Sequence, residues 1–145
     1  MGKSIRELEI SMQRRAQAAY DLMNQDEALK QMGAESVSIS ETKRDLLVQI
    51  AYFCKGRMDP QDVKKVYARV GLYDPSEDEC KKKVTWTLNS KHIEGKAIDL
   101  VPVKDGKLWW NAPDEVWERM GTIGESCGLK WGGRWTERDL PHFEM

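Results

Sequence analysis

Two short segments, far apart in the sequence, carry side chains that could bind a metal ion or transfer protons. His92 and Asp99 are close together, whereas His142 stands near the C-terminus. Asp99 interrupts an apolar run between Ile98 and Leu100, and a buried carboxylate without a partner is costly. A lone Asp in such a run is commonly satisfied by backbone N–H groups, and a lone His commonly lies at the surface or caps a helix.

A metal ion would satisfy both residue types at once. Zinc binds imidazole nitrogen and carboxylate oxygen, and catalytic sites use three protein ligands and leave the fourth position to water. The chain holds only two histidines, so His92, Asp99 and His142 are the available set. The residue types alone leave open the choice between a metal site and separate structural roles. The three cysteines are widely spaced and predict neither a disulfide framework nor a cysteine-based zinc site.

Both segments carry a known pattern. Residues 90–99 match S-x-H-x-x-G-x-A-x-D, and residues 139–144 read Asp-Leu-Pro-His-Phe-Glu. The first pattern resembles the signature of the VanY-like D-alanyl-D-alanine carboxypeptidase family of zinc peptidases. The second is similar to the ending of that family's phage L-alanyl-D-glutamate endopeptidases. The Trp-Gly-Gly at 131–133 and the block at 41–57 also resemble family segments, so the likeness spans about residues 37–145.

The resemblance implies an activity and a role for each matching residue. The implied enzyme is a zinc-dependent endopeptidase that hydrolyses a stem-peptide bond of peptidoglycan, with L-alanyl-D-glutamate as the expected bond. The implied zinc ligands are His92, Asp99 and His142. Asp139 matches the catalytic carboxylate, expected to act as general base on a metal-bound water, and Arg44 matches the arginine that contacts substrate.

Further residues near these motifs are expected to assist. We expect Ser90 to orient its loop or a substrate group, and Trp131 and Trp135 to shape the substrate groove. Glu144 could orient a ligand histidine or simply be an exposed strand residue.

Two positions depart from the family pattern. Lys43 stands where the family has an aromatic residue, and Arg134 stands where the endolysins often have Asp. Either departure would bear on substrate preference rather than on the zinc ligands.

Two other functions remain open on the sequence. One is a D,D- or L,D-carboxypeptidase that trims stem peptides, and it differs from an endopeptidase in its product. The other is a zinc-stabilised module that binds the cell wall without turnover. The presence of both Asp139 and Arg44 favours an enzyme, because a module that only binds would not need this pair.

The elements that must position these residues follow from apolar spacing and turn residues. Apolar residues at spacings of three and four predict helices at about 4–24, 46–54, 60–70 and 113–127. Alternating or continuous apolar runs predict strands at 37–40, 84–88, 97–103, 108–110, 129–131 and 142–144. Helices followed by hairpin-connected strands indicate the α+β class, and the resemblance implies the Hedgehog/DD-peptidase type, with helices on a small antiparallel sheet.

Length and charge narrow the classes of protein further. The 145 residues suit a single zinc peptidase domain over 1–145 without a separate wall-binding domain. The formal net charge of −1 argues against a nucleic-acid partner. No apolar run is long enough to span a membrane, and the N-terminus lacks a signal-peptide core. We therefore expect a monomer of phage or prophage type, made in the host cytoplasm, that reaches the wall after the membrane is breached.

Overall fold

The centre of the structure is an antiparallel sheet of five short strands. The computed structural model describes residues 2–145. The strands are β1 (Ser36–Glu41), β2 (Ala97–Lys104), β3 (Lys107–Leu108), β4 (Lys130–Trp131) and β5 (His142–Glu144). Their order is β1-β2-β5-β4, with β3 paired to β2 through a tight hairpin. Asp99 therefore lies on the central strand β2, and His142 lies on the neighbouring strand β5.

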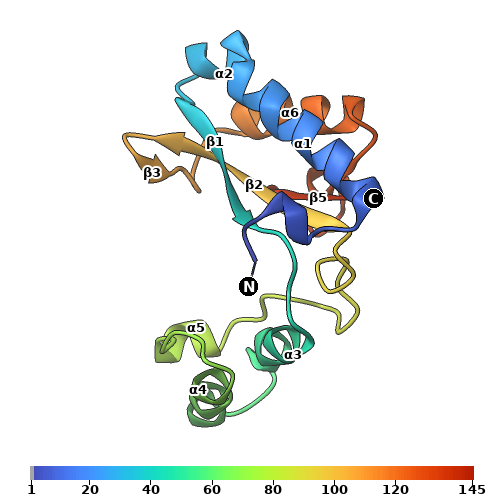
Figure 1. Cartoon of the computed structure of the whole chain (residues 1–145). Helices are drawn as coiled ribbons and strands as arrows, with labels where there is room; N and C mark the ends of the chain where they lie inside the picture. The colour runs from blue at the N-terminus through green and yellow to red at the C-terminus, as the bar shows by residue number, and fades with distance from the viewer. Residues whose placement is uncertain (1) are drawn as a thin grey trace.

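One face of the sheet is covered by helices. The helices α1 (Ile10–Gln25), α2 (Glu27–Gln31) and α6 (Asp114–Ser126) lie together on this face, and a 3-10 turn, η1 (Ile5–Glu7), precedes α1 (Figure 1). The apolar residues of α1 that recur every three or four positions, Met12, Ala16, Ala19 and Met23, are all buried in the main core. The helix therefore forms because its apolar stripe is buried against the sheet and α6.

A second group of helices stands apart from this core. The helices α3 (Leu46–Cys54), α4 (Pro60–Arg69) and α5 (Glu77–Cys80) lie below the sheet in Figure 1. They bury their own small apolar cluster, formed by Ala51, Val63, Tyr67 and Cys80. We call this group the helical lobe. The segment after α5 returns from the lobe to β2 without regular structure. Residues of the lobe and of the sheet line one cleft.

The α+β class is confirmed, and three details of the predicted elements are wrong. The helix expected at 4–24 is interrupted between η1 and α1, and α2 was not predicted. Residues 84–88 are not a strand: Val84, Trp86 and Leu88 are exposed and find no partner strand. Alternation alone does not make a strand when no neighbour accepts its hydrogen bonds.

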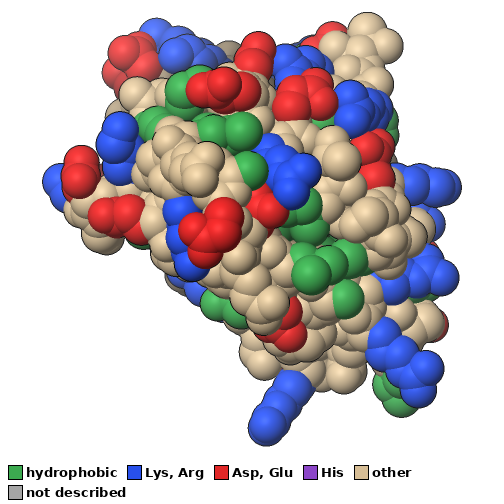
Figure 2. All heavy atoms as spheres, turned by 90° about the horizontal axis from the view of Figure 1, so that it is seen from above, with side chains coloured by type: hydrophobic (Ala, Val, Ile, Leu, Met, Phe, Trp, Pro, Cys, Tyr) green, Lys and Arg blue, Asp and Glu red, His purple; other side chains and the backbone are tan. Residues whose placement is uncertain are grey.

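The surface over the helices shows no concentration of one charge. Seen from above, basic and acidic side chains alternate with small apolar areas, and no histidine is visible on this face (Figure 2). In the described chain, residues 2–145, no helix is long and apolar enough to cross a membrane.

One partly exposed ion pair joins the helices of the covered face. Asp26 caps α2 by accepting a hydrogen bond from the N–H of Leu29 at 3.0 Å. Its two carboxylate oxygens also accept from Nε and Nη2 of Arg119 on α6, at 3.0 and 2.7 Å. The hydrogen bonds from Arg119 hold the pKa of Asp26 below its usual value, and burial opposes them only in part. The bidentate geometry fixes the α1–α2 corner against α6.

We predict that Asp26→Asn destabilises the fold in a pH-dependent way. Because the pKa of Asp26 is lowered by folding, its ionised form stabilises the protein at pH values above the unfolded pKa of about 4. That contribution is lost as the pH falls through the folded pKa. Asn also caps a helix, so the variant loses only the ion pair and should be less stable by about 0.5–1 kcal/mol at pH 7, and the deficit should shrink toward pH 3. Urea unfolding at both pH values measures this, with Asp21→Asn on the exposed side of α1 as the matched control. A deficit independent of pH would contradict it.

Candidate metal centre and active site

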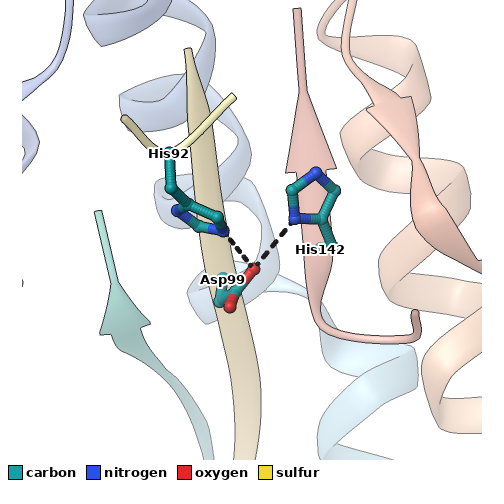
Figure 3. A group of neighbouring side chains, drawn as sticks. All are labelled: His92, Asp99 and His142. Carbon is teal, nitrogen blue, oxygen red and sulfur yellow. Dashed lines mark hydrogen bonds and ion pairs between the residues drawn. The ribbon is translucent and has the colours of Figure 1, made fainter. Parts of the chain in front are cut away.

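The three residues expected to bind metal meet at one point of the sheet. Asp99 on β2 is the direct partner of His142 on β5 in the strand register. His92 lies in the turn before β2, and its ring reaches the same point (Figure 3). The side chains of His92 and His142 are almost fully buried, whereas that of Asp99 is partly accessible. The strand pairing of β2 with β5 therefore brings together two residues that are 43 positions apart in sequence.

The donor atoms fit a small divalent cation. Nε2 of His92 lies 3.1 Å from Oδ1 of Asp99, and Nδ1 of His142 lies 3.3 Å from the same oxygen. One donor atom from each of the three residues lies within 4.8 Å of both others. Ligands at 2.0–2.1 Å in a tetrahedral zinc site are about 3.4 Å apart. The residues present thus match such a site in chemistry and nearly match it in spacing.

Hydrogen bonds behind the rings decide which nitrogens face Asp99. Nδ1 of His92 lies 2.7 Å from the carbonyl oxygen of Thr42, so it must carry the proton and donate. Nε2 of His142 lies 2.8 Å from Oε1 of Glu144 and donates in the same way. The lone pairs of the opposite nitrogens are then directed at Asp99. Of the two roles that the sequence left open for Glu144, its position agrees with orienting a ligand histidine, His142.

The charges around this point favour a cation. When protons instead of a metal ion occupy the facing nitrogens, burial still opposes ionisation of Asp99, but hydrogen bonds from His142 and His92 hold its pKa well below the usual value. Burial also lowers the pKa of His142, but the carboxylates of Asp99 and Glu144 outweigh it and raise this pKa to about 9. Asp99 is therefore ionised, and the protein around His142 stabilises positive charge. A divalent cation held by the same atoms would satisfy both conditions.

Asp139 stands beside this group at the edge of the solvent. Its Oδ2 lies 3.8 Å from Nδ1 of His142, and its side chain is 48% exposed. The surrounding protein desolvates the carboxyl and raises its pKa, while the charge of His142 opposes that shift. A carboxyl with a raised pKa, next to a metal position and open to solvent, is suited to accept and return a proton.

Arg44 lies on the other side of the group, but its charge is already matched. One terminal nitrogen donates to Glu41 and the other to Gln49. Its backbone N–H also donates to the carbonyl of His92 at 3.0 Å. Among the described residues, Nε of Arg44 has no hydrogen-bond partner. Arg44 thus holds the loop of His92 and retains one free donor.

Glu41 is a site residue that the sequence reasoning missed. It pairs with Asp99 across β1 and β2, is 6% exposed, and its Oε1 lies 3.7 Å from Nδ1 of His92. Alternation could not have found it: Glu41 has the parity of Val37 and Ile39, but the register shift between Ile39 and Glu41 puts it opposite Asp99, on the other face from Ile39.

A cleft of about 890 Å³ opens between the sheet and the helical lobe, with this group in its wall. Its lining includes Asp99, Asp139 and both histidines on the sheet side, and three tyrosines with Lys55 on the lobe side. Ser90 lines the cleft and accepts a hydrogen bond from the N–H of His92 at 3.2 Å. Trp135 also lines it, with its ring centre 5.1 Å from that of His142.

Trp131 does not line the cleft, and its expected place in the groove is wrong. It is 1% exposed and belongs to the main core. Its indole N–H donates to the carbonyl of Leu140 at 2.7 Å, which anchors the loop before His142. Arg134 points away from the cleft and pairs with Glu118 and Glu125 of α6 at 3.0 Å each. Lys43 is exposed and does not belong to the cleft lining.

Gly132 permits the close approach of the loop that carries Asp139 and His142. A Cβ atom at Gly132 would lie 2.4 Å from the carbonyl oxygen of Asp139 and 3.2 Å from Cβ of His142. The N–H of Asp139 also donates to the carbonyl of Gly132 at 3.0 Å. The first glycine of Trp-Gly-Gly is therefore required because backbone passes directly over it.

Comparison with known proteins agrees with this geometry. Residues 83–145, which contain all three candidate ligands and Asp139, match the family model described as D-alanyl-D-alanine carboxypeptidase. The resemblance to this peptidase family is confirmed. The expectation that the chain is a metallopeptidase-type hydrolase is confirmed with it.

A solved structure and the curated proteins were also compared with the chain. The crystal structure of the Serratia marcescens L-Ala D-Glu endopeptidase ChiX is similar, with a TM-score of 0.56 and 21% identity over 97% of this chain and 82% of that chain. At that identity the likeness establishes the fold. No curated protein matches the chain.

We predict that Gly132→Ala damages the site without unfolding the protein. The added methyl group must displace the Asp139 carbonyl, and His142 moves with it. Metal affinity and hydrolysis should each fall about tenfold or more, because a displacement of about 1 Å is enough to disturb a catalytic arrangement. Gly71→Ala is the control: its Cβ would meet no atom within 4 Å, so only backbone strain from its positive φ is introduced. Equal metal affinity in the two variants would contradict the prediction.

Proposed function

We propose that the protein is a zinc-dependent peptidoglycan endopeptidase that hydrolyses a stem-peptide bond, with L-alanyl-D-glutamate as the expected bond. The observation that carries the proposal is the convergence of His92, Asp99 and His142 on one point of a cleft with Asp139 beside them. Two imidazoles, one carboxylate and an open side are typical of catalytic rather than structural zinc sites. The family match and the fold of the Serratia endopeptidase support the same activity.

His92, Asp99 and His142 would hold the zinc ion, which when bound polarises a carbonyl group and lowers the pKa of water. Thr42 and Glu144 keep the two imidazoles in the tautomers that binding requires. Asp139 is the proton carrier: its Oδ2 takes a proton from the attacking water and returns it to the leaving amine. Its raised pKa favours the second of these transfers, because the protonated carboxyl is then more readily formed.

Arg44 lines the cleft and would contact substrate there, while its terminal nitrogens keep Glu41 and Gln49 in place. Ser90 keeps the turn of His92 in shape through its hydroxyl. Trp135 offers a half-exposed ring at the entrance of the cleft, where it would pack against the substrate.

The product distinguishes this function from its alternatives. Purified peptidoglycan is digested with zinc-loaded protein, and the released fragments are analysed by mass spectrometry. We expect peptides that begin with D-glutamate, and none in the presence of a chelator or with His92→Ala. Release of free D-alanine would instead indicate a carboxypeptidase. Binding to the wall with no new amino termini would indicate a module without turnover.

We predict that Asp139→Asn keeps the zinc and loses the activity. The amide fills the same space but cannot accept a proton, so kcat should fall by about 10²–10⁴-fold. Zinc content, measured by atomic emission, should stay equimolar. Glu137→Gln is the matched control, because Glu137 lines the same cleft two residues away and no proton transfer is assigned to it. A fully active Asp139→Asn enzyme would contradict the role of Asp139.

A further inference from the structure

The cleft has two walls of different character. On the sheet side the lining carries the carboxylates of Asp99, Asp139 and Glu144, beside the cations Lys91 and Arg138. On the lobe side the lining residues are Tyr52, Lys55, Tyr67 and Tyr73, none of which is acidic. A substrate that spans the cleft would therefore meet the metal group at one end and a lysine among aromatic rings at the other.

Lys55 is an unusual lysine, because it is 5% exposed and yet lies in a cleft wall. It directly follows α3, and its Nζ lies 5.0 Å from the ring centre of Tyr67 and 5.5 Å from that of Tyr73. Burial lowers the pKa of Lys55, but the hydrogen bond with Tyr73 and the neighbouring Tyr67 outweigh this and raise it above its usual value. The side chain is therefore a charged ammonium group fixed in position by rings on two sides.

The charge of Lys55 is incompletely matched within the protein. In residues 2–145 its one carboxylate neighbour is Glu79 of α5, with Oε2 3.6 Å from Nζ and a side chain that is 48% exposed. The hydroxyl of Tyr73 lies 3.0 Å from Nζ and donates to Glu79 at 3.0 Å. Arg44, by contrast, is paired with the buried Glu41. Lys91 and Arg138 also line the cleft, but their side chains are 41% and 40% exposed. Lys55 is thus the buried cation of the lining whose carboxylate partner is exposed.

Glu79 shows that a carboxylate group can bind beside Lys55 and Tyr73. Its carboxylate is held by a hydroxyl and an ammonium group, the two donors that an acidic ligand would use. Because Glu79 is exposed and only loosely paired with Lys55, a carboxylate arriving through the cleft can replace it at small cost.

We propose that Lys55, with the hydroxyl of Tyr73, binds a free carboxylate of the substrate at the lobe end of the cleft, in competition with Glu79. The proposal rests on the proposed function, which supplies a peptide substrate for this cleft. It defines the substrate class as acidic peptides with a free carboxylate at a distance from the scissile bond. Peptides in which this carboxyl is amidated would be poor substrates.

The test compares an acidic peptide containing L-alanyl-D-glutamate with the same peptide in which the free carboxyls are amides. Wild-type protein should bind the acid about tenfold or more tightly than the amide, and Lys55→Met should lose this preference. The loss should appear as a raised KM for the acid with kcat and zinc content nearly unchanged. Glu79→Gln should have the opposite effect and tighten binding of the acid about two- to threefold.

Lys64→Met is the matched control, since Lys64 pairs with Asp74 on the same lobe and lies outside the cleft lining. Thermal unfolding of each variant separates loss of binding from loss of fold, and Glu79→Gln keeps the test valid if Lys55→Met does not fold. Equal affinity of wild-type protein for acid and amide would overturn the proposal. If neither peptide is cleaved, the proposed function fails, and calorimetric binding of the two peptides still decides the role of Lys55.

Discussion

Three lone pairs directed at one point are the constraint on which this structure depends. Nε2 of His92, Nδ1 of His142 and Oδ1 of Asp99 face one another inside the protein, where such groups repel unless a cation lies between them. The hydrogen bonds of Thr42 and Glu144 fix this arrangement from outside. The sheet register, the turn before β2 and the C-terminal strand all serve to bring these atoms together.

The surrounding chain supports the site through close backbone contacts rather than through large side chains. Gly132 lets the Asp139 loop pass within contact distance. Gly95, at φ +71°, accepts a hydrogen bond from the N–H of Glu9 at 3.0 Å, so the start of α1 packs against the turn of His92. Thr42 is clamped in turn by the backbone of Gly2 at 2.7 Å. The N-terminal segment is therefore part of the scaffold of the site.

The α+β class was predictable from local rules, because helical spacing is regular in α1 and α6. The ligand set was not: Asp99 breaks an apolar strand, but only the resemblance of the two motifs joined it to His92 and His142. The sequence could not predict the cleft. Trp86 and Leu88 alternate like strand residues, yet they lie in an irregular segment that pairs with no strand of the sheet. The burial of Trp131 and Lys55 depends on contacts between segments far apart in sequence, which periodicity does not record.

The most direct test of this account is an X-ray crystal structure of the zinc-loaded protein with anomalous data collected on both sides of the zinc absorption edge. The account predicts one strong anomalous peak, bonded to Nε2 of His92, Nδ1 of His142 and a carboxylate oxygen of Asp99, with its open side toward Asp139 and the cleft. No peak at this point, or a zinc ion bound through Nδ1 of His92 or Nε2 of His142, would contradict it.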